Sequence, residues 1–324
     1  MTAWNPLNIL NVYKKDYFMS AIFTELDKLK RERNAVIMAH YYQDPDIQDV
    51  ADFVGDSLAL AQHAKEIEED VILFCGVHFM CETAKIINPE KCVIFPDQNA
   101  GCSLAESAPA SVVEKWVNNH PQYTVISYIN CSAEVKALSD IICTSSNAEK
   151  IINSLPIDEK ILFLPDRFLG SFLNSKTNRH MRLWNGSCHV HEMFSAREVV
   201  QLKTQYPDAL VLAHPECSIE VLVHADHIGS TTSIINYSME SKAQTFIIAT
   251  EPGVIHQMKK QNNGKTYIPL PANNGCSCNE CPHMRLNTLE KMVFALENMA
   301  PEINLNKNLR LKALKPLERM LALS

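Results

Sequence analysis

A series of strands and loops that ends in a cysteine occurs three times in this chain. Of all the features of the sequence, this repetition constrains the fold most strongly. Each copy begins with an apolar run typical of a buried strand, at 35–39, 124–127 and 209–213. A hydroxyl cluster follows, then a second strand that leads into a helix, and then a shorter third strand. Each copy closes with a glycine-containing loop and one cysteine: Cys102, Cys188 or Cys281.

The spacing of these cysteines indicates three equivalent units. Cys102, Cys188 and Cys281 are separated by 86 and 93 residues, and the polar strand ends at His40, Asn130 and His214 are separated by 90 and 84. Such a period is too long for a solenoid and suits a small domain. A cysteine that only fills the core has no reason to recur at the same loop of three diverged units. We therefore expect the three sulfurs to meet at one point.

The alternation of strands and helices predicts an α/β protein with parallel sheets and helices on both faces. We expect units at 16–103, 104–189 and 190–285, with a C-terminal helical segment, 286–324, packing back on the first. Ligands of such sheets bind at the carboxyl ends of the strands. The site should therefore lie where these ends converge.

Composition excludes several classes of function. The 324 residues carry a net charge of −7, which argues against a nucleic-acid partner and favours a small-molecule ligand. No apolar run approaches the ~20 residues of a membrane span, and the N-terminus does not resemble a signal peptide, so we expect a cytoplasmic protein. Eleven cysteines in such a chain indicate metal binding or catalysis rather than disulfides. Four of them, in or beside apolar runs, are expected to be small buried hydrophobes: Cys75, Cys92, Cys131 and Cys143.

Polar side chains at the strand ends are candidates for catalysis and binding. Glu216 and the histidines His40 and His214 are candidates for proton transfer, because a buried carboxylate or imidazole can have its pKa moved toward neutrality. Tyr42 and Tyr128 could donate hydrogen bonds to a developing oxyanion. A lone histidine or tyrosine is more often structural, but two histidines at matching strand ends favour a ligand site.

The hydroxyl clusters stand just before helical stretches and include Ser57, Ser145, Ser230 and Thr231. Capping those helices would account for them, at about 1 kcal/mol each. The same helix N-termini attract carboxylate and phosphate groups. Three of them around one centre would suit a small, multiply anionic substrate.

The cysteine set admits two kinds of metal site. Three thiolates on a 4Fe-4S cluster would leave one iron without a protein ligand and free to act as a Lewis acid. A local zinc knuckle of Cys276, Cys278 and Cys281 with His283 is the rival, but its spacing is irregular and it leaves the recurrence of the other two cysteines unexplained. Cys276 and Cys278 are either spectators or a redox pair.

Taken in order, seven segments of the chain resemble the quinolinate synthase family. They are AHYYQ (39–43), IQDVADFVGDS (47–57), NAGC (99–102), WNGSCHVH (184–191), HPEC (214–217), GSTT (229–232) and CPHM (281–284). The family often has three cysteines spaced two apart near the C-terminus, whereas one residue, Ser277, separates the first two here. The match of Cys281 rests on the Pro and Met that follow it.

The resemblance implies three analogous αβα-sandwich domains around a pseudo-threefold axis, with a 4Fe-4S cluster and the active site at their junction. It implies condensation of iminosuccinate (iminoaspartate) with dihydroxyacetone phosphate to quinolinate, with loss of phosphate and two waters, and functional coupling to an L-aspartate oxidase or dehydrogenase. Cys102, Cys188 and Cys281 would hold the cluster, and Tyr42 and Glu216 would assist proton transfer, with His214 and Tyr128 also in catalytic positions. The residues that would bind the substrate are His40, Ser57, Tyr128, Asn130, Ser145, His214, Glu216, Ser230 and Thr231.

Two alternatives remain at the level of sequence. Another cluster-dependent hydro-lyase would use the same open iron to remove water. A metal-stabilised or redox-sensing module, which is not an enzyme, would use the cysteines for folding or signalling. The second alternative does not require the convergent His, Tyr and Glu residues.

Overall fold

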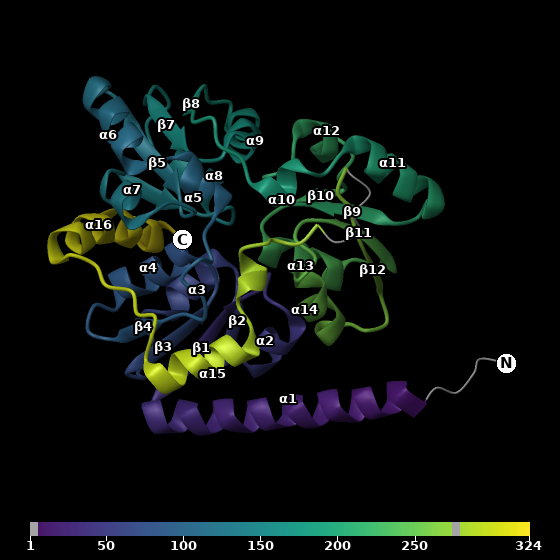
Figure 1. Ribbon diagram of the computed structural model, residues 1–324. Helices are drawn as coiled ribbons and strands as arrows, with labels where there is room; N and C mark the ends of the chain where they lie inside the picture. The colour runs from purple at the N-terminus through teal and green to yellow at the C-terminus, as the bar shows by residue number, and fades with distance from the viewer. Residues whose placement is uncertain (1–5, 274–278) are drawn as a thin grey trace.

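Three four-stranded sheets follow one another along the chain (Figure 1). This computed structural model describes residues 6–273 and 279–324, with side chains from residue 19 onward, so Cys276 and Cys278 lie outside the described residues. In each sheet all strand pairs are parallel and the first and third strands are central. The first sheet contains β1 (Ala35–His40), β2 (Phe53–Gly55), β3 (Val71–Cys75) and β4 (Cys92–Ile94). The second contains β5 (Thr124–Tyr128), β6 (Ile141–Cys143), β7 (Ile161–Leu164) and β8 (Arg182–Leu183), and the third β9 (Leu210–Ala213), β10 (His227–Ile228), β11 (Thr245–Ala249) and β12 (Thr266–Pro269).

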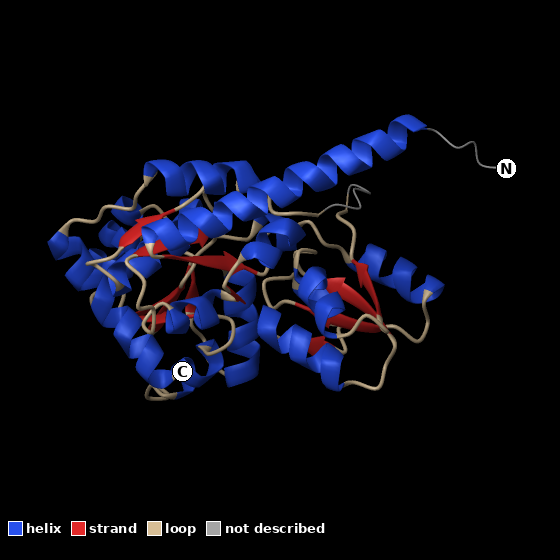
Figure 2. Cartoon of the chain, turned by 90° about the horizontal axis from the view of Figure 1, so that it is seen from below, coloured by secondary structure: helices blue, strands red, loops and turns tan. Residues whose placement is uncertain are grey.

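Helices flank the strands of all three sheets (Figure 2). The first unit contains α1 (Pro6–Arg33), α2 (Pro45–Val50), α3 (Ser57–His63) and α4 (His78–Ile87). The second contains α5 (Ser103–Ser107), α6 (Ala110–Asn119), α7 (Ala133–Ala137), α8 (Ala148–Asn153) and α9 (Arg167–Thr177), and the third α10 (His189–Glu192), α11 (Ala196–Gln205), α12 (Ile219–Leu222), α13 (Thr231–Glu240) and α14 (Val254–Gln261). The chain ends with the 3-10 turn η1 (Met284–Leu286), α15 (Leu289–Asn298) and α16 (Lys307–Leu323).

The central strands are continuously apolar because both faces of each sheet are covered. All six residues of β1 are buried; Val36 and Met38 face a core shared with the second sheet, whereas Ile37 faces a core that includes residues of α1 and α15. The two faces of the third sheet contribute to two separate cores. Strands buried on both faces are typical of parallel sheets. The predicted α/β class, with three αβα sandwiches, is confirmed.

Each sheet has one strand more than the sequence predicted. Between the first strand and the hydroxyl cluster, every unit contains a short helix followed by a short edge strand, β2, β6 or β10. These strands are only two or three residues long, too short to produce a period-2 pattern. They place the hydroxyl clusters at the same edge of the sheets as the ends of β1, β5 and β9.

One hydrogen bond, here called the carboxylate clamp, occurs at the same place in all three units and gives their true alignment. A backbone N–H of the first strand donates to a side-chain carboxylate 15 residues later, at 2.8 Å in each unit, in the pairs Ile37–Asp52, Val125–Asp140 and Val211–Asp226. On this alignment Tyr128 is the equivalent of His40 and His214, with intervals of 88 and 86 residues. Aligning Asn130 with the histidines was therefore wrong by two residues. Tyr128, the buried last residue of β5, and Asn130 are both polar candidates at this strand end, and only the alignment of the clamps distinguishes them.

The C-terminal helices differ in their packing. α15 lies against α1 and β3 of the first unit. α16 lies mainly against α7 and β6 of the second unit and reaches the first through α4, so the expectation for 286–324 was wrong for this helix. Ala313, Leu317 and Met320 are its buried side chains in the core that the two units share. The boundaries predicted between the units stay a prediction.

Three of the four cysteines expected to be core residues, Cys75, Cys131 and Cys143, are fully buried, and Cys92 is half-buried. Among the described residues, no helix combines the length and the apolar character needed to cross a membrane.

Candidate active site

One cavity is lined by residues of all three units. It receives the strand-end residues His40, Tyr42, Tyr128, Asn130, His214 and Glu216, the hydroxyl residues Ser57, Ser145 and Thr231, and the three cysteines Cys102, Cys188 and Cys281. Their convergence follows from the fold, because strand ends and the loops after them meet at the carboxyl edges of parallel sheets. The described residues that line the cavity include no lysine or arginine.

The three cysteines occupy similar local positions. Cys102 and Cys188 directly precede α5 and α10, and Cys281 lies three residues before η1. Burial raises the pKa of Cys102 to about 12, although the nearby N–H groups of Ala105 and Leu104 act in the opposite direction. Burial also raises the pKa of Cys188 and Cys281. Without a cation to stabilise the thiolates, these groups are therefore neutral thiols.

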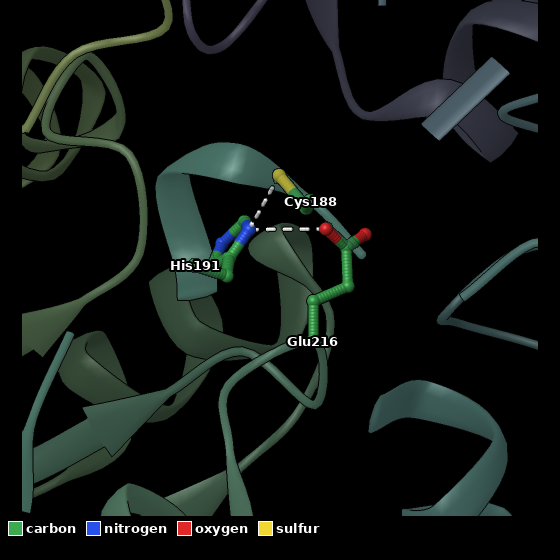
Figure 3. Close-up of side chains that lie close together, drawn as sticks. All are labelled: Cys188, His191 and Glu216. Carbon is green, nitrogen blue, oxygen red and sulfur yellow. Dashed lines mark hydrogen bonds and ion pairs between the residues drawn. The ribbon is translucent and has the colours of Figure 1, made fainter. Parts of the chain in front are cut away.

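The buried carboxylate Glu216 has partners from two other parts of the cavity, and Figure 3 shows one of them, His191. Tyr128 donates to its Oε1 at 2.6 Å, and His191 Nδ1 lies 3.0 Å from its Oε2. His191 Nδ1 is also 3.2 Å from the sulfur of Cys188, and Cys188, His191 and Glu216 together could hold a metal ion. Burial alone would raise the pKa of Glu216, but His191, His214 and the Tyr128 hydroxyl outweigh it and hold the pKa well below its usual range. Glu216 is therefore ionised.

Tyr42 belongs to a second chain of hydrogen bonds. Its hydroxyl lies 2.8 Å from the hydroxyl of Thr250 and 3.0 Å from that of Thr231. Thr250 in turn lies 2.9 Å from His191 Nε2, so Tyr42 and Glu216 are connected through two residues. Burial, together with the charge of Glu216, raises the pKa of Tyr42 well above its usual value. The tyrosine is thus a neutral hydroxyl that can donate a hydrogen bond.

His40 and His214 have the same local conformation in their two units. The Nδ1 atom of each accepts the backbone N–H two residues later, from Tyr42 at 3.2 Å and from Glu216 at 3.3 Å. This bond leaves the proton on Nε2, which in His214 lies 3.2 Å from the Ser145 hydroxyl. Burial lowers the pKa of both histidines to about 4. Both are therefore neutral near pH 7.

The hydroxyl residues are equivalent in the three units. Ser57, Ser145 and Thr231 lie 17 residues after His40, Tyr128 and His214, respectively, and all three line the cavity. Ser230 is the one predicted site residue that does not line it. Its side chain caps α13 by accepting the N–H of Ser233 at 3.3 Å. The buried Oδ1 of Asn130 has no hydrogen-bond partner among the described residues, so it can bond to a ligand.

Sequence reasoning missed several residues of the site. His191 follows Cys188 by three residues on α10 and could have been found from that spacing, whereas Thr250 has no sequence signal of its own. Glu251 also lines the cavity. It follows β11 at the position that Asp166 occupies after β7 and Val77 occupies after β3. Two units thus have a buried acid where the first has valine.

Glu251 connects the loop of Cys281 to the rest of the site. Its Oε1 accepts from Arg285 at 2.8 Å and from the N–H of Cys281 at 3.3 Å, and its Oε2 accepts from the N–H of Gly253 at 2.7 Å. Arg285 also pairs with Asp44 of the first unit at 2.8 Å. Burial acts to raise the pKa of Glu251, and the neighbouring Arg285 guanidinium opposes it. Because every partner within reach donates, we regard the group as ionised.

Fold and site together define an α/β enzyme whose cavity lies between three repeated units and carries a cysteine set suited to metal. The family model described as quinolinate synthetase A protein (NadA) matches residues 24–322. The chain therefore belongs to the quinolinate synthase A family, and the resemblance inferred from its motifs is confirmed.

Individual relatives extend over nearly the whole chain. A protein named quinolinate synthase from Rippkaea orientalis is 55% identical over 323 residues, which cover 100% of this chain and 99% of that protein. Proteins with the same name from Gloeothece citriformis and Chloroherpeton thalassium are 58% and 57% identical over 303 and 304 residues, with 94% of each chain covered.

Proposed function

We propose that this protein condenses iminosuccinate with dihydroxyacetone phosphate to give quinolinate, phosphate and two waters. The proposal rests on one observation above all: in a member of the quinolinate synthase A family, three repeat-equivalent cysteines and a set of His, Tyr, Glu and hydroxyl side chains line the same cavity. A module that used its cysteines only for folding or signalling would not need these other groups.

The cysteines fit an iron–sulfur cofactor. Thiols whose pKa is raised by burial become ligands only when a cation displaces their protons. Cys102, Cys188 and Cys281 would hold a 4Fe-4S cluster, and the bound cluster would supply one open iron as a Lewis acid for a substrate oxygen. Glu216 and His191 lie beside Cys188 and would face this group.

The remaining groups of the cavity suit a small substrate with several negative charges. The hydroxyls of Ser57, Ser145 and Thr231 can donate to carboxylate or phosphate oxygens. The amide of Asn130 and the Nε2–H groups of the neutral histidines add further donors. Since no described lysine or arginine lines the cavity, binding depends on neutral donors held in place by the fold.

Proton transfer is assigned to Glu216 and Tyr42. Glu216 is ionised and hydrogen-bonded to Tyr128 at 2.6 Å, so it can accept a proton from the substrate while the Tyr128 hydroxyl stabilises its charge. Tyr42 can donate to a developing oxyanion and can be reprotonated through Thr250. The aliphatic carbons of both substrates must lose protons before the ring becomes aromatic, which is work for such a base.

The supply of the imine substrate calls for an enzyme that oxidises an amino acid. We propose functional coupling to an L-aspartate oxidase or dehydrogenase, because iminosuccinate hydrolyses readily in water. The nine cysteines among the described residues are all free, which agrees with a reducing compartment such as the cytoplasm.

Product analysis tests the proposed function. Anaerobically purified protein with its cluster is given iminosuccinate, generated in place, and dihydroxyacetone phosphate. We expect quinolinate and phosphate in equal amounts, and none when either substrate is omitted. Absence of quinolinate with an intact cluster would contradict the proposal. A hydro-lyase would instead dehydrate a single hydroxy acid without dihydroxyacetone phosphate.

A further inference from the structure

Asp56 binds all three units at once. It belongs to the first unit, where its Oδ1 caps α3 by accepting the N–H groups of Leu58 at 3.1 Å and Ala59 at 3.0 Å. Its Oδ2 accepts the hydroxyl of Ser146 from the second unit at 3.3 Å and the hydroxyl of Thr232 from the third at 2.7 Å. The carboxylate is 7% exposed and lines the cavity.

The two hydroxyl partners occupy the same position of their units. The carboxylate clamps align Ser146 with Thr232, and the first unit has Leu58 at that position. The three units therefore meet around this carboxylate, with one unit supplying the acceptor and the other two supplying matching donors. An ionised carboxylate only accepts hydrogen bonds, so both hydroxyls must donate to it.

This arrangement controls the hydroxyls that face the cavity. Ser57 directly follows Asp56, while Ser145 and Thr231 directly precede Ser146 and Thr232. Each of these cavity-lining residues is therefore one peptide bond away from a residue of the Asp56 group. A change in the position of one unit would separate its hydroxyl from the other two.

A negative charge among groups that bind anions needs an explanation. Four donors surround Asp56, two backbone N–H groups and two hydroxyls, and they offset its charge. A helix cap needs only the first two of these donors. Capping therefore explains Oδ1 but leaves the contacts of Oδ2 with two other units unexplained.

We propose that Asp56 is a positioning residue that fixes the three units relative to one another, so that Ser57, Ser145 and Thr231 bind a dicarboxylate together. The inference rests on the proposed function for the identity of the ligand, but not for the contacts. Asp56 acts through these three residues and does not itself contact the reacting atoms.

Binding of quinolinate to the cluster-loaded protein, measured by calorimetry, tests the proposal with a graded set of variants. Asp56→Ala removes the acceptor, and we expect its Kd to rise about tenfold or more. Asp56→Asn keeps the cap and offers an amide to hydroxyls that can turn and accept, so its Kd should stay within about threefold of wild type. Ser146→Ala and Thr232→Val each remove one donor and should fall between these values.

Two controls separate positioning from simple destabilisation. Asp226→Ala removes a carboxylate that also binds a backbone N–H but does not line the cavity, so it should lower stability and leave the Kd unchanged. The double variant Asp56→Ala/Thr232→Val should bind no more weakly than Asp56→Ala alone, and its loss of stability should be less than additive.

Several results would overturn the proposal. Asp56→Ala could bind quinolinate as tightly as wild type, or the effects of Asp56→Ala and Thr232→Val could be fully additive in stability. If wild-type protein neither makes nor binds quinolinate, the proposed function fails. The stabilities of Asp56→Ala, Thr232→Val and the double variant still test whether Asp56 links the units. Effects that are less than additive support the link, and additive effects refute it.

Discussion

Glu216 is the residue on which most polar contacts of the cavity converge. It accepts from Tyr128, pairs with His191 and shares a turn with His214, and all four side chains are buried. Its two oxygens face groups from the second unit, from α10 and from its own strand end. A carboxylate held this way has a fixed direction within the cavity.

Replacing Glu216 by Gln tests its role as a base. The amide keeps the size of the side chain but cannot accept a proton, so we expect kcat to fall about 10²- to 10⁴-fold. Iron and sulfide content should stay at the wild-type level, because the three cysteines proposed to hold the cluster are unchanged. Tyr128→Phe removes the 2.6 Å bond but leaves the carboxylate in place, so it is the milder change and should retain more activity. Unchanged turnover of Glu216→Gln would contradict this role.

Protonation of His40 and His214 makes the free energy of unfolding depend on pH, and the sign of this dependence follows from their pKa values. The pKa values of His40 and His214 fall to about 4 in the folded protein, below the usual 6.5. Between these values the unfolded chain binds protons that the folded chain does not, so the free energy of unfolding decreases as the pH falls from 6.5 to 4. The loss is about 3 kcal/mol for each histidine at most.

Denaturant unfolding from pH 4 to pH 7 measures this effect. The variants His40→Asn and His214→Asn should each show a flatter dependence than wild type over this range. Equal slopes in wild type and both variants would show that these imidazoles are not held neutral by burial.

At the scale of elements, the loop of Cys281 depends on a buried ion pair. Glu251 is fully buried and accepts from Arg285 and from the N–H of Cys281. Arg285 follows Cys281 by four residues and reaches Asp44 of the first unit. The position of the third cysteine thus depends on a contact between the first and third units.

Arg285→Met tests this dependence. Removing one partner of a buried pair leaves Glu251 without its charge partner, and we expect a loss of roughly 2 to 4 kcal/mol in stability. Iron content should also fall, because the Cys281 loop loses its support. Asp44→Asn changes the half-exposed partner of Arg285 and should cost less than about 1 kcal/mol. Full iron content and stability in Arg285→Met would contradict the account.

The sequence predicted the central strands of each unit well and the edges poorly. β1, β3 and β11 were recognisable because strands buried on both faces are runs of Val, Ile and Leu. The edge strands β2, β6 and β10 were missed because their two or three residues have no periodicity. The second unit was misaligned because two polar residues, Tyr128 and Asn130, stand at its strand end and Asn130 was matched to the histidines.

Site residues were predictable where a residue type recurs between units, as for the cysteines, the two histidines and the cavity-facing hydroxyls. Thr250 and Glu251 were not, because their roles come from tertiary contacts. Ser230 was assigned to the site as a member of the same hydroxyl cluster as Thr231. In the structure Ser230 is the N-cap of α13, and its side chain bonds to that helix instead of lining the cavity.

At the scale of the whole molecule, α16 contributes to the core shared by the first two units. Leu317 is fully buried in that core, and truncation to Ala should destabilise the protein by about 2 to 5 kcal/mol. Leu311 on the same helix is 42% exposed, so Leu311→Ala should cost much less. Chemical denaturation of both variants measures the difference. Equal losses would show that α16 is not packed as described.

The site forms only when the three units come together. Each unit supplies a cysteine, at least one cavity-facing hydroxyl and a polar strand end, and none of these sets is complete within a single unit. The cavity exists only where the three meet.

Counting iron and sulfide in anaerobically purified serine variants tests the central claim, that cysteines from three units hold one cluster. Wild type and Cys92→Ser, which changes a half-buried cysteine outside the cavity, should contain about four irons per chain. Cys102→Ser, Cys188→Ser and Cys281→Ser should each lose most of their iron and sulfide. A full complement of iron in any of these three variants, or an equal loss in Cys92→Ser, would contradict the account.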